Sequence, residues 1–187
     1  MILAVQGPRD IPQFATILPQ PVPLSRFTLR DQHGGEFDNE SLEDRWSLVF
    51  FGFTHCPDIC PATLQQLAIA RKRVLDAGAT AFPDIVLISV DPERDTPEIL
   101  AAYTGHFGAG ITGITGSLEE LRKLTSSLGI YFQKSATGNL DDEDSYGVDH
   151  SAVVILINRD AEFHALFSAP HKVDHFVADI PLIMESS

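Results

Sequence analysis

An α/β fold, with a central mixed sheet and helices on both of its faces, is the architecture that this sequence predicts. Two continuous apolar runs, 46–53 and 84–90, have the length and composition of strands that are buried on both faces. The segment between them repeats its apolar residues at close to the 3.6-residue period of a helix. Because crossovers between strands of one sheet are right-handed, we expect these two strands to be parallel.

Composition and charge set the class of protein. The 187 residues are 44% hydrophobic and 21% charged, which suits one domain with a full hydrophobic core. The net charge is −13 and the 13 basic residues are dispersed, whereas nucleic-acid binding needs clustered Lys and Arg. We therefore expect no nucleic-acid partner.

The N-terminal part is expected to be a tether followed by a hairpin. Residues 1–23 contain five prolines and no apolar periodicity, so they are predicted to be an extended segment that precedes the domain of residues 24–187. The start, 1–6, has too few apolar residues for an export signal or a membrane span, so we expect neither within this sequence. A start just after a removed anchor and a native cytosolic terminus are both open on the residues alone. Gly34 and Gly35 lie between two short apolar stretches and predict a small hairpin.

Helix signals follow each of the two long strands. Pro61 is tolerable in a first helical turn, and Gly78 marks the end of the helix that follows the first strand. The second strand is followed by a helix that Asp95 or Thr96 caps and that runs to about residue 106. A further helix, 117–129, begins with a capping box.

The C-terminal part predicts a hairpin and a last helix. Residues 153–157 are a third buried strand, and the turn 158–160 leads into the partner segment 162–167. This hairpin is expected to supply the antiparallel part of the mixed sheet. Residues 171–183 are predicted to be helical.

Cys56 and Cys60 are the only cysteines of the chain, and they lie at the turn from the first long strand to the first helix. Two such thiols can form a disulfide, bind a soft metal together, or alternate between the two states. Thiols at the first strand–helix turn of this element order indicate a thioredoxin-like fold. By analogy with that fold, the loop with Asp149, His150 and Ser151 is expected to face the cysteines.

Three long motifs, 52–61, 89–97 and 142–151, resemble those of the Sco/SenC family of copper-binding assembly factors for cytochrome c oxidase. The resemblance covers residues 24–183 in order. It implies a thioredoxin fold in which one copper ion, as Cu(I) or Cu(II), is bound by Cys56, Cys60 and His150. Thiolate and imidazole together can hold both oxidation states, so the residue chemistry agrees.

The resemblance also implies partners and a location. It implies a metallochaperone that delivers copper to the dinuclear copper (CuA) centre of cytochrome c oxidase, with Cys56 and Cys60 as a redox pair that can reduce the target cysteines. Other copper chaperones or thiol reductants are the further partners that it implies. Family members usually carry an N-terminal membrane anchor, and this sequence departs from that pattern. The location that the resemblance implies is periplasmic or at the extracytoplasmic face of the inner membrane.

Other functions of the same cysteines remain open on the residues alone. The runner-up is a thiol-disulfide oxidoreductase without copper delivery, although such enzymes usually have two residues between the cysteines and a cis-proline before the third strand. A structural disulfide would close too short a loop to stabilise the chain much. A structural zinc site lacks a fourth ligand, and a catalytic Cys2His zinc site has no obvious water-activating partner. A peroxidase lacks an arginine close to the thiols.

Four other features are given mainly structural roles. His55 is kept out of the ligand set because adjacent side chains point apart, and Asp58 is expected to bond the backbone at the helix start. His171 and His175 are expected on a solvated helix face and not at a second metal site. The acidic run 141–144 is expected to be a solvated turn, with partner docking as the alternative.

Overall fold

The computed structural model describes residues 11–135 and 147–186, without the side chains at 135, 147, 149 and 150. The helical elements are η1 (Glu40–Leu42), α1 (Ile59–Asp76), α2 (Pro97–Gly105), α3 (Leu118–Ser127) and α4 (Val173–Glu185). The strands are β1 (Thr16–Pro23), β2 (Thr28–Asp31), β3 (Glu36–Asp38), β4 (Ser47–Gly52), β5 (Asp84–Ser89), β6 (Ile111–Thr115), β7 (Phe132–Ser135), β8 (Gly147–His150), β9 (Val153–Ile157) and β10 (Glu162–Ser168).

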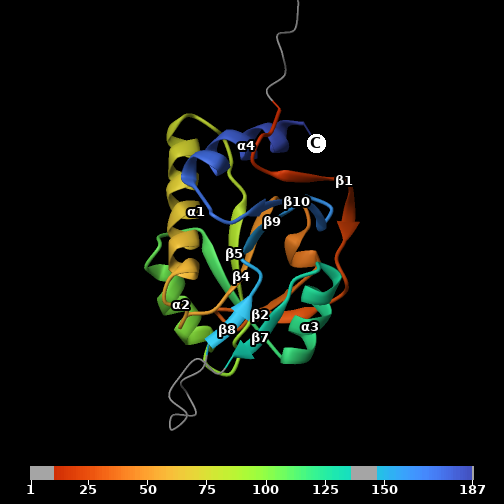
Figure 1. Cartoon of the computed structure of the whole chain (residues 1–187), viewed down its shortest axis with the longest axis vertical. Coiled ribbons are helices and arrows are strands. Elements are labelled where there is room, and N and C mark those ends of the chain that lie inside the picture. Colours follow the sequence, from red (N-terminus) through yellow and green to blue (C-terminus); the bar gives the residue numbers. More distant parts are fainter. Residues whose placement is uncertain (1–10, 136–146, 187) are drawn as a thin grey trace, which may run out of the picture.

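A central mixed sheet organises the molecule, as predicted. Its strand order is β1-β10-β9-β4-β5-β6-β2-β3, with a separate two-stranded sheet of β7 and β8 (Figure 1). The two long strands β4 and β5 are parallel, and β9 runs antiparallel to both β4 and β10. The expected parallel pair and the expected antiparallel hairpin are therefore both confirmed.

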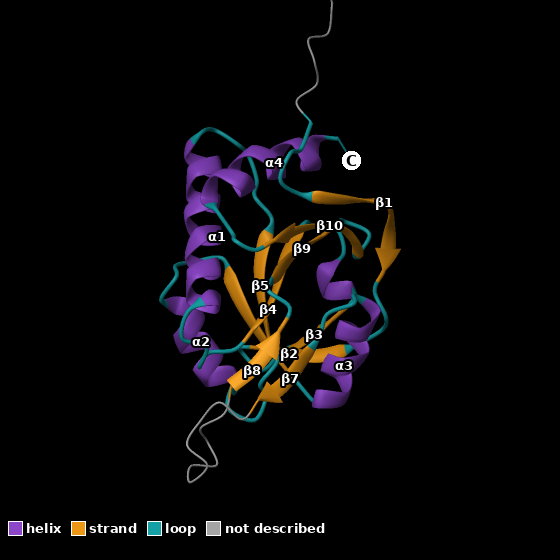
Figure 2. Ribbon diagram, viewed as in Figure 1, coloured by secondary structure: helices purple, strands orange, loops and turns teal. Residues whose placement is uncertain are grey.

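The core is densest around β4, in which all six residues are buried. Phe50 and Phe51 have no exposed surface although they are adjacent, so the two faces of the strand are both covered. Figure 2 shows α1 and α2 on one side of the sheet and α3 on the other. This double cover explains why the sequence of β4 is a continuous apolar run and not an alternating one.

The capping signals are met in part. Thr96 accepts a hydrogen bond from the backbone N–H of Ile99 and so caps α2, while the alternative cap, Asp95, has another role. Ser117 caps α3 by accepting from the backbone N–H of Glu120. The reciprocal half of that capping box is absent among the described contacts, because the Glu120 carboxylate accepts from the backbone N–H of Thr28 in β2.

The N-terminal hairpin forms where it was expected. Strands β2 and β3 pair antiparallel, and Gly34 takes a φ of +85° in the turn between them. The preceding segment contributes more than an extended lead, because β1 pairs with β10 and forms one edge of the large sheet. Its prolines remove backbone donors from that edge.

A buried carboxylate holds the start of the described chain to the last helix. Asp179 of α4 is 1% exposed and accepts hydrogen bonds from the backbone N–H groups of Gln13, Phe14 and Ala15, at 3.0, 2.6 and 2.7 Å. The Phe14 ring also stacks on His175, with 4.0 Å between ring centroids. Within the described residues, no helix is long and apolar enough to cross a membrane.

Candidate metal centre

The two cysteines lie in a tight connection between β4 and α1. The backbone N–H of Cys56 donates to the carbonyl of Phe53, which closes a turn directly after the strand. The helix begins at Ile59, so Cys56 precedes it and Cys60 is its second residue. Pro57 lies outside the helix, and Pro61 is in its first turn, where a missing N–H leaves no unsatisfied donor.

Both cysteines are buried, and the start of α1 brings them close together. Cys60 has no exposed surface and Cys56 is 9% exposed, so solvent reaches the pair from the Cys56 side. The backbone N–H of Cys60 points at Cys56 Sγ, 3.5 Å away, and no disulfide joins the two residues. An N–H donor and the positive end of a helix dipole both stabilise a negative charge on the Cys56 sulfur.

The environment of Cys60 favours its protonated form. The hydrogen bond with Cys56 raises the pKa of the Cys60 thiol far above its usual range, and burial raises the pKa further. A metal ion that binds both sulfurs must therefore displace a proton from Cys60.

The glycine at the end of β4 makes room for the inner sulfur. A Cβ atom on Gly52 would lie 2.9 Å from Cys60 Sγ and 2.9 Å from Phe50 Cε1. The backbone of β4 therefore packs directly against the inner sulfur, and a side chain at position 52 would force Cys60 or one of the neighbouring side chains to move.

Asp95 supports the cysteine turn, a role that differs from the helix cap predicted from its sequence position. Its carboxylate has no exposed surface and accepts three hydrogen bonds, from the backbone N–H of Thr54 (3.0 Å), from Thr54 Oγ1 (2.6 Å) and from Ser89 Oγ (2.6 Å). It thus ties the loop after β5 to the residue two positions before Cys56. The signal available in the sequence was its place in the 89–97 motif, where Asp95 was considered only as a helix cap.

Two further groups lie close to the site. Asp91 is buried and accepts a 2.5 Å hydrogen bond from Arg94 Nε, and the Arg94 guanidinium lies 6.0 Å from the centroid of the Phe53 ring. The buried hydroxyl of Tyr103 has no hydrogen-bond partner among the described residues. Burial raises the pKa of Tyr103, and the nearby charges of Cys60 and other groups raise it further.

His150 is the last residue of β8, and its side chain lies outside the described part of the structure. Its backbone is paired with Phe132 of β7. Ser151, which was expected to face the cysteines together with His150 and Asp149, is bonded to Tyr131 in both directions: its N–H donates to the Tyr131 carbonyl and its Oγ accepts from the Tyr131 N–H. These bonds fix the chain directly after His150 to the start of β7.

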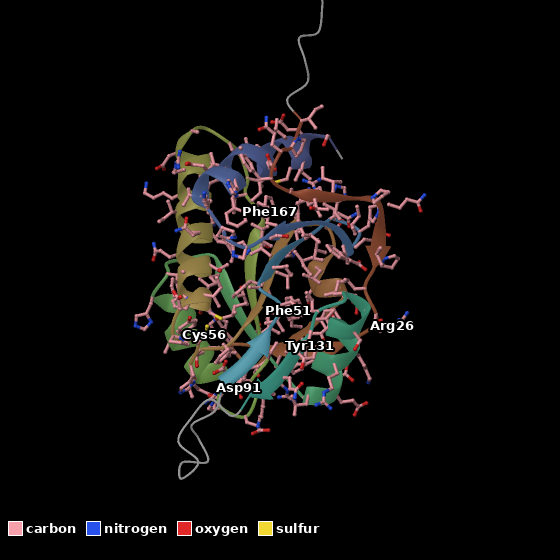
Figure 3. All side chains as sticks on the ribbon, in the orientation of Figure 1. Arg26, Phe51, Cys56, Asp91, Tyr131 and Phe167 are labelled. Carbon is pink, nitrogen blue, oxygen red and sulfur yellow. The ribbon has the colours of Figure 1, made fainter. Side chains whose placement is uncertain are left out.

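The β7–β8 hairpin and the thiol turn occupy the same end of the molecule. In Figure 1, β8 and the N-terminal turn of α1 lie at the end opposite α4, and Figure 3 places Cys56 and Asp91 at that end. The placement of the His150 side chain against the cysteines stays a prediction. Within the described residues, no group of three or more His, Cys, Asp or Glu could hold a metal ion.

The other residues singled out in the sequence have varied positions. The prediction for Asp58 was wrong, since its side chain makes no capping hydrogen bond at the start of α1. His171 precedes α4 and is partly buried, with Nδ1 2.9 Å from Thr63 Oγ1, while His175 stacks on Phe14. These two histidines therefore do not form a solvated pair. The acidic run 141–144 lies outside the described residues.

The donor chemistry of the site suits a soft, monovalent metal. Cu(I) prefers sulfur ligands such as these two buried thiols at the start of α1. An imidazole as the third ligand would allow the same site to bind Cu(II) as well. The same pair can close to a disulfide, because Cys56 precedes α1 and its sulfur lies against the backbone N–H of Cys60, the second residue of the helix.

Comparisons with known proteins agree with this chemistry. The SCO1/SenC family model matches residues 18–185. Over 170 residues the chain is 35% identical to a protein of Stutzerimonas stutzeri named for copper binding, covering 91% of this chain and 81% of that protein. It is 34% identical over 158 residues to the mitochondrial SCO1 homologue of Homo sapiens, covering 82% of this chain and 50% of that protein. The chain thus spans about half the length of this human relative.

Solved structures give the same assignment. The copper-bound ScoI of Arabidopsis thaliana has a TM-score of 0.78 and 32% identity, covering 87% of this chain and 98% of that chain. The copper-bound Sco1 of yeast has a TM-score of 0.80 and 28% identity, covering 89% of this chain and 91% of that chain. The thioredoxin-like fold inferred from the sequence is thereby confirmed. With a buried thiol pair at the start of α1 and a family match across nearly the whole described chain, this protein belongs to the SCO1/SenC family.

Proposed function

We propose that this protein is a copper metallochaperone that binds one copper ion through Cys56, Cys60 and His150 and delivers it to the dinuclear copper centre of cytochrome c oxidase. The observation that carries the proposal is the pair of buried, adjacent thiols at the N-terminal turn of α1, in a chain that resembles copper-bound Sco structures. The copper ion is cargo, so the site has to release it as well as bind it.

The chain supplies ligands from two separate elements. Cys56 and Cys60 come from the connection between β4 and α1, whereas His150 is the last residue of β8. The hydrogen bonds between Ser151 and Tyr131 hold the backbone that directly follows His150. Copper would therefore bridge the β7–β8 hairpin to the thiol turn. A partner that competes for one thiolate or for the imidazole would open the site, because Cu(I) exchanges readily among low-coordinate sulfur and nitrogen ligands.

The proposal extends to partners and place. The target is the copper-bearing subunit of the oxidase, and other copper chaperones or thiol reductants load the site or reset the thiols. We place the protein on the extracytoplasmic face of the inner membrane, held by an anchor on its N-terminal side. Fractionation of cells into cytosol, periplasm and membrane tests this placement, and a wholly cytosolic protein would contradict it.

The direct test is anaerobic Cu(I) titration of the reduced protein against a chromophoric Cu(I) chelator. We expect one copper per chain, and tight binding should be lost in Cys56→Ser and in Cys60→Ser. The control is His33→Asn, since His33 lies in the exposed β2–β3 turn. If the double variant Cys56→Ser/Cys60→Ser kept the affinity of the wild type, the site would be wrongly assigned.

The role of His150 is tested by comparing the two oxidation states. His150→Ala should keep much of the Cu(I) affinity, because two thiolates suffice for Cu(I), and it should lose most of the Cu(II) affinity, which gains more from imidazole. Copper should also protect the backbone of β8 from hydrogen exchange in the wild type and less so in the variant. Equal Cu(II) affinity and equal protection in both proteins would remove His150 from the site.

A second candidate function is thiol-disulfide exchange, and the asymmetry of the pair favours it. Cys56 is the sulfur that solvent reaches, and Cys60 lies fully buried behind it with a raised pKa, as suits an attacking thiol and its resolving partner. Two electrons from the pair would reduce a target disulfide and leave Cys56 and Cys60 bridged. Copper and this disulfide should exclude each other, because a disulfide sulfur is a poor ligand.

An insulin-reduction assay on the same preparation separates the two functions. Turnover at the rate of a dedicated reductase, combined with weak copper binding, would favour the oxidoreductase. Mass spectrometry that found a full complement of copper on protein whose cysteines resist alkylation as a disulfide would contradict mutual exclusion.

A further inference from the structure

We propose that His55 is an entry ligand, which takes up Cu(I) from a donor at the surface and passes it to Cys56. This inference rests on the proposed copper function and adds a residue outside the resting ligand set of Cys56, Cys60 and His150. It starts from a difference in exposure. The His55 side chain is 53% exposed, whereas the neighbouring Cys56 is 9% exposed and Cys60 is fully buried.

The ring of His55 is held by a relay that begins at a buried carboxylate. Asp95 Oδ1 accepts a 2.6 Å hydrogen bond from Thr54 Oγ1, so the single hydroxyl proton of Thr54 is directed to Asp95. The Thr54 oxygen is then left with lone pairs toward His55 Nδ1, which lies 3.1 Å away. If Nδ1 carried a lone pair, it would face only the lone pairs of the Thr54 oxygen, and no hydrogen bond could form. Nδ1 must therefore carry a proton and donate it to Thr54 Oγ1.

A second contact favours the same tautomer. Asp95 Oδ1 lies 3.9 Å from His55 Nδ1, and a carboxylate at that distance attracts an N–H group and repels a nitrogen lone pair. With its proton on Nδ1, the neutral ring presents a free lone pair on Nε2. Among the described residues, His55 Nε2 makes no hydrogen bond.

This arrangement is the one by which proteins prepare a histidine to bind a metal. A metal-binding histidine usually donates its other ring N–H to an oxygen that fixes its tautomer and orientation. Here Thr54 is that oxygen, and Asp95 orients Thr54. The carboxylate that supports the cysteine turn thus also fixes the tautomer of the exposed His55 ring through Thr54.

The transfer is a ligand exchange without a redox step. Cu(I) leaves one ligand of the donor as His55 Nε2 coordinates it. The Cys56 thiol then gives its proton to solvent, and its thiolate replaces Nε2 on the ion. The imidazole keeps its Nδ1 proton throughout, copper stays Cu(I), and His55 is free to accept the next ion. His55 and Cys56 are consecutive residues of the loop between β4 and α1, so the exchange takes place within one loop.

The test separates the rate of copper uptake from the affinity at equilibrium. Stopped-flow mixing of reduced protein with Cu(I) bicinchoninate, under anaerobic conditions, gives the rate, and titration with the same chelator gives the affinity. His55→Asn removes the entry ligand itself, so it should slow uptake by at least the roughly tenfold that loss of a ligand-orienting contact costs, and it should leave the equilibrium affinity unchanged. The matched control, His33→Asn, should keep the rate of the wild type.

Variants of Thr54 test the relay itself. Thr54→Val removes the hydroxyl and should slow uptake, whereas Thr54→Ser keeps it and should restore the rate. The ring ¹⁵N chemical shifts of neutral His55 provide a readout without metal: they should report the Nδ1–H tautomer in the wild type and in Thr54→Ser, and a tautomer mixture in Thr54→Val.

The failures of the two proposals are distinguishable. Wild-type uptake rates in His55→Asn, or an Nε2–H tautomer in the wild type, would overturn the entry role and leave the copper site intact. Loss of copper binding in the wild type itself would overturn the metallochaperone proposal. A fall in equilibrium affinity in His55→Asn as large as the fall in rate would make His55 a resting ligand and would also contradict the entry role.

Discussion

Replacement of Gly52 by alanine should disturb the thiol pair through a single methyl group. The added Cβ would lie 2.9 Å from Cys60 Sγ, 2.9 Å from Phe50 Cε1 and 3.3 Å from Leu87 Cδ1. Favourable contacts between such atoms need about 3.5–4.0 Å, so at least one group has to move by roughly half an ångström or more. Phe50, Leu87 and Cys60 are all fully buried, so none can turn into solvent.

The expected cost follows from overpacking. Extra methyl groups in a packed core cost about 1–3 kcal/mol, and the absence of an exposed neighbour places this one near the upper end of that range. For a chain of this length, about 2–3 kcal/mol corresponds to a fall of about 4–12 °C in the melting temperature. The sulfur is also expected to leave its position by more than the ~0.2 Å that metal–ligand distances tolerate, so Cu(I) affinity should fall as well.

Thermal unfolding and Cu(I) competition on the same variant measure both effects. Gly105→Ala is the matched control: no heavy atom lies within 4 Å of its added Cβ, and it ends α2. Because alanine forms helix better than glycine by up to about 1 kcal/mol, this control should be as stable as the wild type or slightly more stable. If Gly52→Ala melted with the wild type and kept its Cu(I) affinity, the close packing of Gly52 against the inner sulfur would be refuted.

Three further changes test other parts of the structure. Asp95→Ala leaves three hydrogen-bond donors without their acceptor, and each donor that finds no other acceptor should lower the free energy of unfolding by about 1–3 kcal/mol. Residues 53–58 should therefore exchange their amide hydrogens faster, and unchanged exchange would contradict the support role of Asp95. Burial lowers the pKa of His171, so the stability that it contributes is complete above its unfolded pKa of about 6.5 and is lost as the pH falls through the lowered value. Between about pH 7.5 and about pH 5.5, the melting temperature of His171→Leu should therefore fall less than that of the wild type. An equal fall in both proteins would refute the contribution of His171 to the pH dependence of stability. Asp179→Ala should free the amides of residues 13–15 for fast exchange while the thiol turn stays protected, and continued protection of 13–15 would show that the clamp is unnecessary.

The strongest sequence signals led to the elements that hold the site. The runs around β4 and β5 could be predicted because strands covered on both faces contain almost only apolar residues. The helix between them could be predicted from its period and from Gly78, which takes a φ of +98° two residues after α1 ends. Cys56 and Cys60 followed from their rarity and their place at the strand–helix turn.

Elements with weak local signals were missed. Strand β6, with sequence Ile-Thr-Gly-Ile-Thr, is short and contains a glycine, because Gly113 packs with the position of its absent Cβ 2.8 Å from Leu100 Cβ. Strand β1 has three prolines and exposed residues, and only its pairing with β10 makes it a strand. These elements depend on partners far away in the sequence, which local patterns do not reveal.

The roles of individual polar residues were hardest to predict. Asp95 and Asp58 are both acids near the start of a helix, and a cap was the reasonable expectation for each. The structure instead buries Asp95 among Thr54 and Ser89 and leaves Asp58 without a capping bond. A side chain that crosses from one loop to another can be assigned only when both loops are placed.

The Asp179 clamp determines from which side this domain can be held. It fixes residues 13–15 to α4, and in Figure 1 α4 lies at one end of the long axis while Figure 3 places Cys56 toward the other. Any surface, fusion partner or label joined to the chain ahead of residue 13 therefore meets the α4 pole first. The opposite pole, with both thiols, is left pointing outward. Immobilisation through the N-terminal side would thus present the thiol pair to a second protein in solution, whereas coupling through the β7–β8 hairpin would hinder access to it.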